Sequence, residues 1–345
     1  MRMLLVLGLA GCASSNTMWN AEQRAQDARR LEQQGQASDA RAQWALAASK
    51  AAKVGGEKAL VLRVEALARS GACQDIAEPL AAARASGPTD RGMRERLDLA
   101  DAECALAIGD AGGAQAALES PLESANADRR ARAEYVAGRA AMVRQEYEAA
   151  VGHFKRAREP DAAGRAIIAG QRALIARATE RGDLTPIATE LSRALRTRTG
   201  TDEAGPLVDL ITAVQTVPTT PSAGARLHVA ELARDSLYAP LLAGTLFLEA
   251  AASDTASLFA PKALIAAMAL LPDQRDSIVA LLDTRYASSP YARALHGEVS
   301  VAYTAAEDSL ARELGMQGLS QHAAPAGTRT DSPPRVTGPR GPKLP

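Results

Sequence analysis

Residues 137–157 read AGRAAMVRQEYEAAVGHFKRA. Small or apolar residues recur in steps of three and four on both sides of Gln145, a pattern typical of two amphipathic helices joined by a short turn. Gly138 and Ala141 come before the turn, and the bulky Phe154 comes after it. The stretch therefore predicts a helix pair in which small side chains on the first helix let the second approach closely.

The same frame recurs at a nearly fixed period. Glycines at positions 35, 71, 109 and 182, together with Gln145, mark five turns at spacings of 36, 38, 36 and 37 residues. A period of this size is typical of stacked helical repeats, and runs of alternating β-branched or aromatic residues are missing. We therefore expect an all-α chain with five helix pairs. A large residue after the turn is expected to fill the space toward the next pair, as for Trp44, Leu80, Phe154 and Leu191.

This frame resembles the tetratricopeptide repeat, and residues 137–157 match it best. The family's tryptophan near the start of the first helix and its regular proline at the end of each unit are absent, and the period exceeds the family's roughly 34 residues. The resemblance covers about residues 21–198. It implies a right-handed α-solenoid of stacked antiparallel helix pairs over residues 20–199. A generic stack of helical hairpins would give almost the same architecture.

A second helical region is expected over residues 205–315, after an interruption rich in glycine and proline. Ser289 followed by Pro290 predicts a helix N-cap and a first-turn proline. The stretches SLFAPKALIAAMALL (residues 257–271) and TRYASSPYARALHGE (residues 284–298) resemble segments of periplasmic repeat lipoproteins. That class includes the tetratricopeptide lipoprotein of the machine that assembles outer-membrane β-barrels, and relatives linked to cell division. One predicted helix face comprises Leu227, Ala230, Ala233 and Leu237.

The end of the chain, residues 320–345, is rich in proline and glycine and poor in apolar residues. Such a segment buries too little surface to offset its ordering entropy, so we expect a disordered tail. Basic residues outnumber acidic ones there, which leaves two interpretations open: contact with an acidic surface, or a solvated tail.

The chain begins MRMLLVLGLAGCASSN. The apolar run from Met3 to Ala10 is too short to span a bilayer, but it fits the apolar region of a secretory signal. The sequence LAGC, which ends at Cys12, resembles the lipobox of bacterial lipoprotein signals. The resemblance implies a signal peptide over residues 1–11 and a lipid on Cys12.

In the same family the residue after the lipidated cysteine influences sorting, and Ala13 implies the outer membrane, with the protein facing the periplasm. Helical patterning begins near Asn20, so residues 12–19 are expected to comprise the lipidated cysteine and a short tether. The seven tether residues, 13–19, reach at most about 25 Å. The alternative is a free cysteine on a frayed N-terminal segment.

No catalytic pattern accompanies these features. Acidic and basic residues balance at 40 each, which argues against a general nucleic-acid binder. Glu65 with Arg69 is interpreted as an ordinary surface ion pair one helical turn apart. We expect no catalytic residues, no metal site and no cofactor, because phosphate-loop, hydrolase and zinc motifs are absent. The histidines are far apart in the sequence, at His153, His228, His296 and His322.

Two further cysteines fall in neighbouring repeats. Cys73 is expected to begin the second helix of the second pair, and Cys104 lies late in the first helix of the third. Antiparallel stacking brings these helix ends together, and an exported protein can form disulfides. The alternative is that both are small buried hydrophobic residues.

A partner would bind the face that the first helices of the pairs line. On the first helix of the fourth pair, Glu134 belongs to the packing side, and a second stripe points away from it. That stripe suits an extended peptide with acidic groups or a free carboxylate, and a solvated helix face is the alternative. With one residue from the fifth pair, the predicted groove comprises Arg132, Tyr135, Arg139, Met142 and Arg172.

These features favour a lipid-anchored, periplasm-facing adaptor that binds protein or peptide partners and has no enzymatic activity. A subunit of the outer-membrane β-barrel assembly machinery is an alternative of the same class. A murein-acting lytic enzyme, or its activator, is the alternative of another class. A lytic enzyme needs a catalytic Glu in an aromatic, glycine-rich cleft, and aromatic residues make up only 3% of this chain.

Overall fold

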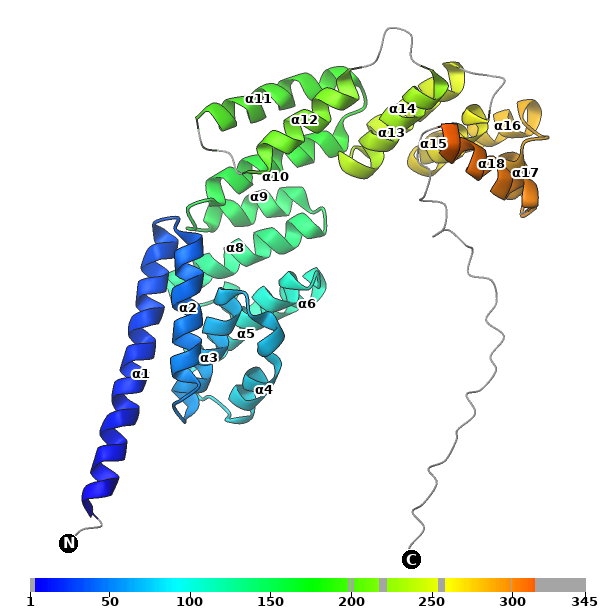
Figure 1. The fold of residues 1–345 in the computed structure, drawn as a ribbon. Coiled ribbons are helices and arrows are strands. Elements are labelled where there is room, and N and C mark those ends of the chain that lie inside the picture. The colour runs from blue at the N-terminus through cyan, green and yellow to red at the C-terminus, as the bar shows by residue number, and fades with distance from the viewer. Residues whose placement is uncertain are drawn as a thin grey trace, which may run out of the picture. The chain divides into compact units, whose positions relative to one another are not determined.

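The computed structural model describes residues 4–197, 199, 202–216, 222–253, 258–298 and 300–313, with side chains from residue 16 onward. Throughout these residues the regular secondary structure is helical, and none of them forms a strand (Figure 1). The predicted all-α class is therefore confirmed. The segment predicted to be a disordered tail lies outside the described residues.

The chain divides into two compact units. Unit 1 comprises residues 1–218 and 229–245, and unit 2 comprises residues 219–228 and 246–345. The helices of unit 1 up to residue 215 are α1 (Leu4–Gln33), α2 (Ala37–Ala51), α3 (Glu57–Ser70), α4 (Ala77–Ala85), α5 (Arg91–Ala107), α6 (Ala111–Ala117), α7 (Glu119–Leu122), α8 (Ala127–Val143), α9 (Tyr147–Arg156), α10 (Ala162–Arg177), α11 (Leu184–Arg196) and α12 (Ala204–Gln215).

The five predicted turns separate these helices as expected. Gly35, Gly71 and Gly109 adopt positive φ angles of 74°, 85° and 85°. Gln145 has the same kind of backbone, with φ of 61°, at the position that the repeat period assigns to it. The fifth turn differs: Gly182 lies in the short 3-10 helix Arg181–Asp183, and its φ is outside the left-handed region.

Second helices are less regular than first helices. Cys73 lies in a 3-10 turn, Cys73–Asp75, ahead of α4 instead of opening that helix. In the third pair a single second helix was expected, but the helix is interrupted at Leu118, between α6 and α7. Pro121 explains the break, because its ring clashes with the carbonyl of residue 117 and it has no N–H to donate.

Large residues fill the space between successive pairs. Trp44 of α2 is fully buried against Ala28 of α1 and Leu62 of α3. Leu80 of α4 packs against α3 and α5 in the same way, and Phe154 of α9 packs against α8 and α10. Each of these clusters contains both helices of one pair and the first helix of the next. Burial of a side chain this large stabilises the fold by about 2–3 kcal/mol.

Gly138 shows why small residues are needed on the first helices. A Cβ atom at this position would lie 2.7 Å from a ring carbon of Phe154, which is closer than van der Waals contact allows. The predicted packing side of α8 is thereby confirmed, because Glu134 and Ala141 also face α9: Glu134 pairs with Arg156, and Ala141 packs with Phe154.

The start of α1 corrects one expectation. Helical patterning was expected from about Asn20, after a tether over residues 12–19, but α1 begins at Leu4 and includes that segment. No proline interrupts residues 4–33, so the helix can propagate through them. A helix rises 1.5 Å per residue, so residues 13–19 span about 10 Å instead of about 25 Å.

The remaining helices are also placed where helical patterning was predicted. Leu227, Ala230, Ala233 and Leu237 are all buried. The Ser289 side chain caps α17 by accepting from the Tyr291 N–H, and Pro290 is the first residue of that helix. Within unit 2 the ring of Tyr291 packs edge-on against Tyr303, with centroids 5.4 Å apart. The elements are α13 (Ala223–Glu231), the π-helix Leu232–Ser236, α14 (Pro240–Ser253), α15 (Phe259–Leu270), α16 (Arg275–Arg285), α17 (Pro290–Leu295) and α18 (Val301–Glu313).

Cys73 and Cys104 form a disulfide in this structure, with Cα atoms 5.3 Å apart. Cys104 is buried in the cluster that joins α3, α4 and α5. The bond thus links the second pair to the first helix of the third. Its formation in the cell stays a prediction.

Candidate functional site

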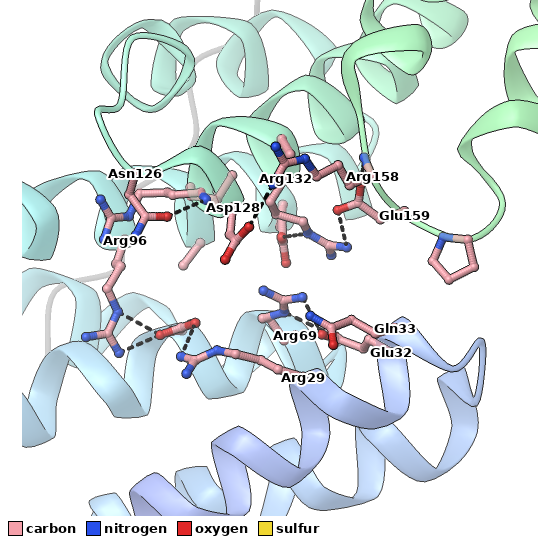
Figure 2. A pocket seen from close by; sticks show the side chains of 17 residues that line it. Arg29, Glu32, Gln33, Arg69, Arg96, Asn126, Asp128, Arg132, Arg158 and Glu159 are labelled. Atoms are coloured by element: carbon pink, nitrogen blue, oxygen red, sulfur yellow. Dashed lines mark hydrogen bonds and ion pairs between the residues drawn. The ribbon is translucent and has the colours of Figure 1, made fainter.

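A cavity of about 480 Å³ lies in unit 1, where first helices of the pairs face one another (Figure 2). It is lined by residues of α1, α3, α5 and α8 and by the connection between α9 and α10. Six arginines and five carboxylates dominate the lining. The lining residues are Arg29, Glu32, Gln33, Glu65, Arg69, Arg96, Leu99, Ala100, Glu103, Asn126, Asp128, Arg129, Ala131, Arg132, Arg158, Glu159 and Pro160.

At one end of the cavity a single carboxylate is shared by two guanidinium groups. Glu65 of α3 accepts from Arg29 of α1 at 2.9 Å and from the Nε of Arg96 of α5 at 2.7 Å. The Glu65 side chain is 12% exposed. We call this group of three residues the Glu65 end.

The two guanidinium groups determine the protonation of Glu65. Burial alone would raise the pKa of its carboxyl group, but the positive charges of Arg96, Arg29 and Arg69 outweigh burial and lower that pKa to about 2. Glu65 is therefore ionised at any physiological pH, and the Glu65 end carries one net positive charge.

At the other end a single guanidinium group serves two carboxylates. Arg132 of α8 donates from Nε to Glu103 of α5 at 2.7 Å. Its Nη1 atom is 3.5 Å from Glu159, at the limit of hydrogen-bond distance. We call this group of three residues the Arg132 end.

The two carboxylates of the Arg132 end differ in their electrostatic environment. Burial raises the pKa of Glu103, but the charge and hydrogen bond of Arg132 outweigh it, so that pKa is lowered. For Glu159 burial prevails over the more distant Arg132, and the pKa is raised. Glu159 is therefore the less completely neutralised acid.

Between the two ends lies a balanced pair. Arg69 of α3 makes a two-pronged contact with Glu32 of α1, and Trp44 donates its indole N–H to the same carboxylate at 2.9 Å. The Arg69 guanidinium also stacks over the Trp44 ring, 5.0 Å from its centroid. This contact connects the cavity wall to the core of the first pair.

A second buried carboxylate lies behind the lining. Glu95 of α5 is 1% exposed and accepts from Arg129, Arg91 and Ser124 at 2.6, 2.8 and 2.5 Å. These hydrogen bonds outweigh the effect of burial and lower the pKa of Glu95. Arg129 is the one member of this group that reaches the cavity.

The predicted groove residues do not form one open surface. Arg132 lines the cavity, but Tyr135 is only 8% exposed, and its hydroxyl donates to Asp161 at 2.9 Å. Met142 packs into the cluster around Phe154. The reason is that α8 has a first helix on each side of it, α5 and α10, so little of its surface remains free for a stripe of exposed residues.

The other two groove residues are also engaged or half-buried. Arg139 lies outside the cavity lining, and its charge helps to lower the pKa of Glu103. Arg172 of α10 donates to the backbone carbonyl of Leu237 at 3.3 Å, and its guanidinium lies over the Tyr238 ring. Of the five predicted groove residues, Arg132 alone lines the cavity.

The expected Glu65–Arg69 surface pair is also corrected. Glu65 contacts Arg29, 36 residues away, and Arg69 contacts Glu32, 37 residues away. Both separations equal one repeat period, so the side chains pair across successive first helices instead of along one helix. A search for opposite charges one period apart would have found them.

This arrangement suits the binding of charged groups. An arginine has five N–H donors, and the hydrogen bonds and ion pair that link Arg96 to Glu65 use two of them. The residues that line the cavity include no His, Cys, Ser, Thr or Tyr to act as a nucleophile or proton shuttle. Among the described residues, no group of three His, Cys, Asp or Glu is placed to hold a metal ion.

Comparisons of the chain with protein-family models, with curated proteins and with solved structures find no match. Over the described part of the chain, no helix has both the length and the apolar character needed to cross a membrane.

Proposed function

We propose that this protein is a lipid-anchored scaffold of the bacterial cell envelope that binds protein or peptide partners in the cavity of unit 1. In this proposal the five helix pairs form a right-handed, tetratricopeptide-like α-solenoid. The lipid is attached to Cys12, and the protein faces the periplasm from the outer membrane. The protein acts by binding and has no chemistry of its own.

One observation carries the binding part of the proposal: the cavity is lined by the first helices of four successive pairs. Its volume of about 480 Å³ is within the 300–1,000 Å³ that ligand pockets usually have. The stacking part is supported by the clusters around Trp44, Leu80 and Phe154, each of which joins one pair to the next.

The anchor part is supported by LAGC at residues 9–12 and by the short apolar run before it. Metabolic labelling with an alkyne-tagged fatty acid should mark the wild-type chain, and Cys12→Ala should abolish the label and the membrane fractionation together. Labelling that persists in Cys12→Ala would refute the anchor at this residue.

The binding part is tested by site-specific photo-crosslinking in cells that export the full-length chain. Gln33 and Pro160 line the cavity on different elements and are exposed, so a photoreactive residue at either position should capture the same partner. Ile108 is 80% exposed and lies outside the cavity lining, and it is the matched control. Equal capture from Ile108 and Gln33, or capture from neither cavity position, would contradict a partner in the cavity.

A further inference from the structure

The two ends of the cavity share their counter-ions unequally. The Glu65 end has one carboxylate between two guanidinium groups, and the Arg132 end has one guanidinium between two carboxylates. The Arg69–Glu32 pair between them is balanced. The cavity therefore has a positive end and a negative end. In Figure 2 Arg96 is at the left of the cavity and Glu159 at the right.

The surroundings strengthen the positive end. Arg129 also lines the cavity. It shares the carboxylate of Glu95 with Arg91, so this group too has two guanidinium groups for one carboxylate. At the negative end Arg139 adds a positive charge that acts on Glu103. Arg139 does not line the cavity, and among the described residues it makes no ion pair with Glu103 or Glu159, so the guanidinium contact of Glu159 is the 3.5 Å one with Arg132. Glu159 also accepts from the backbone N–H of Arg158 at 3.2 Å, a neutral donor that does not compensate its charge.

We propose that the cavity binds a peptide segment that carries an acidic and a basic side chain together, the acid at the Glu65 end and the base at the Arg132 end. This inference rests on the proposed function and specifies its ligand. An ammonium group beside Glu159 supplies the counter-charge that Arg132 gives only at a distance. A carboxylate beside Arg29 and Arg96 accepts from guanidinium donors that Glu65 leaves unused.

Physical reasons favour a doubly charged ligand over a singly charged one. A ligand with only an acid would leave the Arg132 end as it is, and a ligand with only a base would leave the Glu65 end as it is. Charge complementarity at both ends also fixes the direction in which the segment lies, because the reversed orientation places like charges together. Since part of the cavity is open to solvent, binding should weaken as salt rises.

The test uses fluorescein-labelled decapeptides of glycine and serine, with fluorescence anisotropy as the readout. One series carries a Glu and a Lys separated by one to five residues. The comparison peptides replace the Lys, the Glu or both by Gln. At least one member of the first series should bind about ten-fold more tightly than both of its singly charged counterparts, which corresponds to about 1.4 kcal/mol.

Variants identify which end recognises which charge. Glu159→Gln should weaken the doubly charged peptide about ten-fold and leave the peptide with Glu alone unchanged. Arg96→Gln should do the reverse, weakening peptides that carry Glu and leaving the peptide with Lys alone unchanged. Arg144→Gln is the matched control, because its ion pair with Glu146 is exposed and outside the cavity. Far-UV circular dichroism shows whether each variant is folded.

The results separate this inference from the proposed function. If singly charged or neutral peptides bind as tightly as doubly charged ones, or if no peptide binds, the inference is overturned. In that case crosslinking of a partner from Gln33 and Pro160 would still support binding in the cavity. Failure of both experiments would overturn the ligand and the scaffold together.

Discussion

The two ends of the cavity use the same residue types in opposite proportion. At the Glu65 end the shared group is an acid, and both arginines that serve it are partly exposed, at 44% and 27% of their side chains. At the Arg132 end the shared group is a base that is 18% exposed, and the side chains of its two acids, Glu103 and Glu159, are 7% and 17% exposed. Each end therefore has the sign of its two outer groups. The net charge is positive where two guanidinium groups flank one carboxylate, and negative where two carboxylates flank one guanidinium group.

The contacts between successive first helices differ in what reinforces them. The Cys73–Cys104 disulfide ties α5 to the turn between α3 and α4. The chain has only three cysteines, so no second intrachain disulfide can link α5 to α8. There the ion pair of Arg132 with Glu103 makes the corresponding contact.

The largest effect is expected from Arg132→Met. This substitution leaves the buried Glu103 and the half-buried Glu159 with no cation between them, and removing one partner of a buried pair costs about 4 kcal/mol of the free energy of unfolding. Urea denaturation followed by circular dichroism measures the loss. Arg139→Met, two turns further along α8, should cost less than about 1 kcal/mol. Equal losses from the two substitutions would contradict a specific stabilising role for Arg132.

Reduction of the disulfide should cost about 3 kcal/mol, because the bond closes a loop between residues 31 positions apart. The Cys73→Ser/Cys104→Ser double variant should lose the same amount and should become insensitive to reductant. Hydrogen exchange should rise in α3 and α5 and stay unchanged in α8 and α9.

The mass of the non-reduced wild type should be two hydrogens lower than that of the reduced chain. If both thiols, Cys73 and Cys104, can be alkylated in denatured, non-reduced protein, the prediction that they form a disulfide is wrong.

Glu65→Gln should cost about 3 kcal/mol at pH 7, because the pKa of Glu65 is lowered from 4.5 to about 2 in the folded state. A carboxyl group with a lowered folded pKa contributes stability that is present above the unfolded pKa and lost as pH falls. The difference between wild type and variant should therefore shrink between pH 4.5 and pH 2. Urea midpoints at pH 7, 4 and 3 measure it, and a difference independent of pH would contradict the electrostatic origin.

The smallest effect is expected from Glu159→Gln, which should change the free energy of unfolding by less than about 0.5 kcal/mol at pH 7. Burial raises the pKa of Glu159, so any stability that this group contributes is present below pH 4.5 and lost as pH rises through its folded pKa. Thermal unfolding at pH 7 is sufficient to test this. A loss as large as that of Glu65→Gln would mean that Glu159 is as well paired as Glu65, and the two ends would then be alike.

The sequence predicted where the helices of residues 20–199 turn, because those turns have a strong local requirement. A positive φ, which glycine tolerates best, occurs at Gly35, Gly71 and Gly109. The repeat period predicted a turn at Gln145 as well, although that residue is not a glycine. Two predicted helix boundaries were wrong, each for a local reason. Nothing stops α1 between Leu4 and Asn20, and Pro121 breaks the second helix of the third pair.

The cavity was harder to predict, because its contacts join helices and are not visible within one helix. Glu65 and Arg69 are correctly spaced for an ion pair along α3, yet each finds a partner on another first helix. Tyr135 and Met142 were assigned to an exposed stripe, but flanking helices bury Tyr135 and cover part of Met142. Single-helix periodicity identifies one packing face and leaves a second packing face undetected.

The unequal sharing of charge is tested most directly by the pKa values of the two carboxyl groups. Side-chain ¹³C NMR of glutamate-labelled protein, with resonances assigned from Glu65→Gln and Glu159→Gln, follows both titrations in the folded chain. Glu65 should titrate with a pKa of about 2, and Glu159 should titrate above 4.5. Two carboxyl groups that titrate together near 4.5, or a Glu159 that titrates below Glu65, would contradict a cavity with a positive and a negative end.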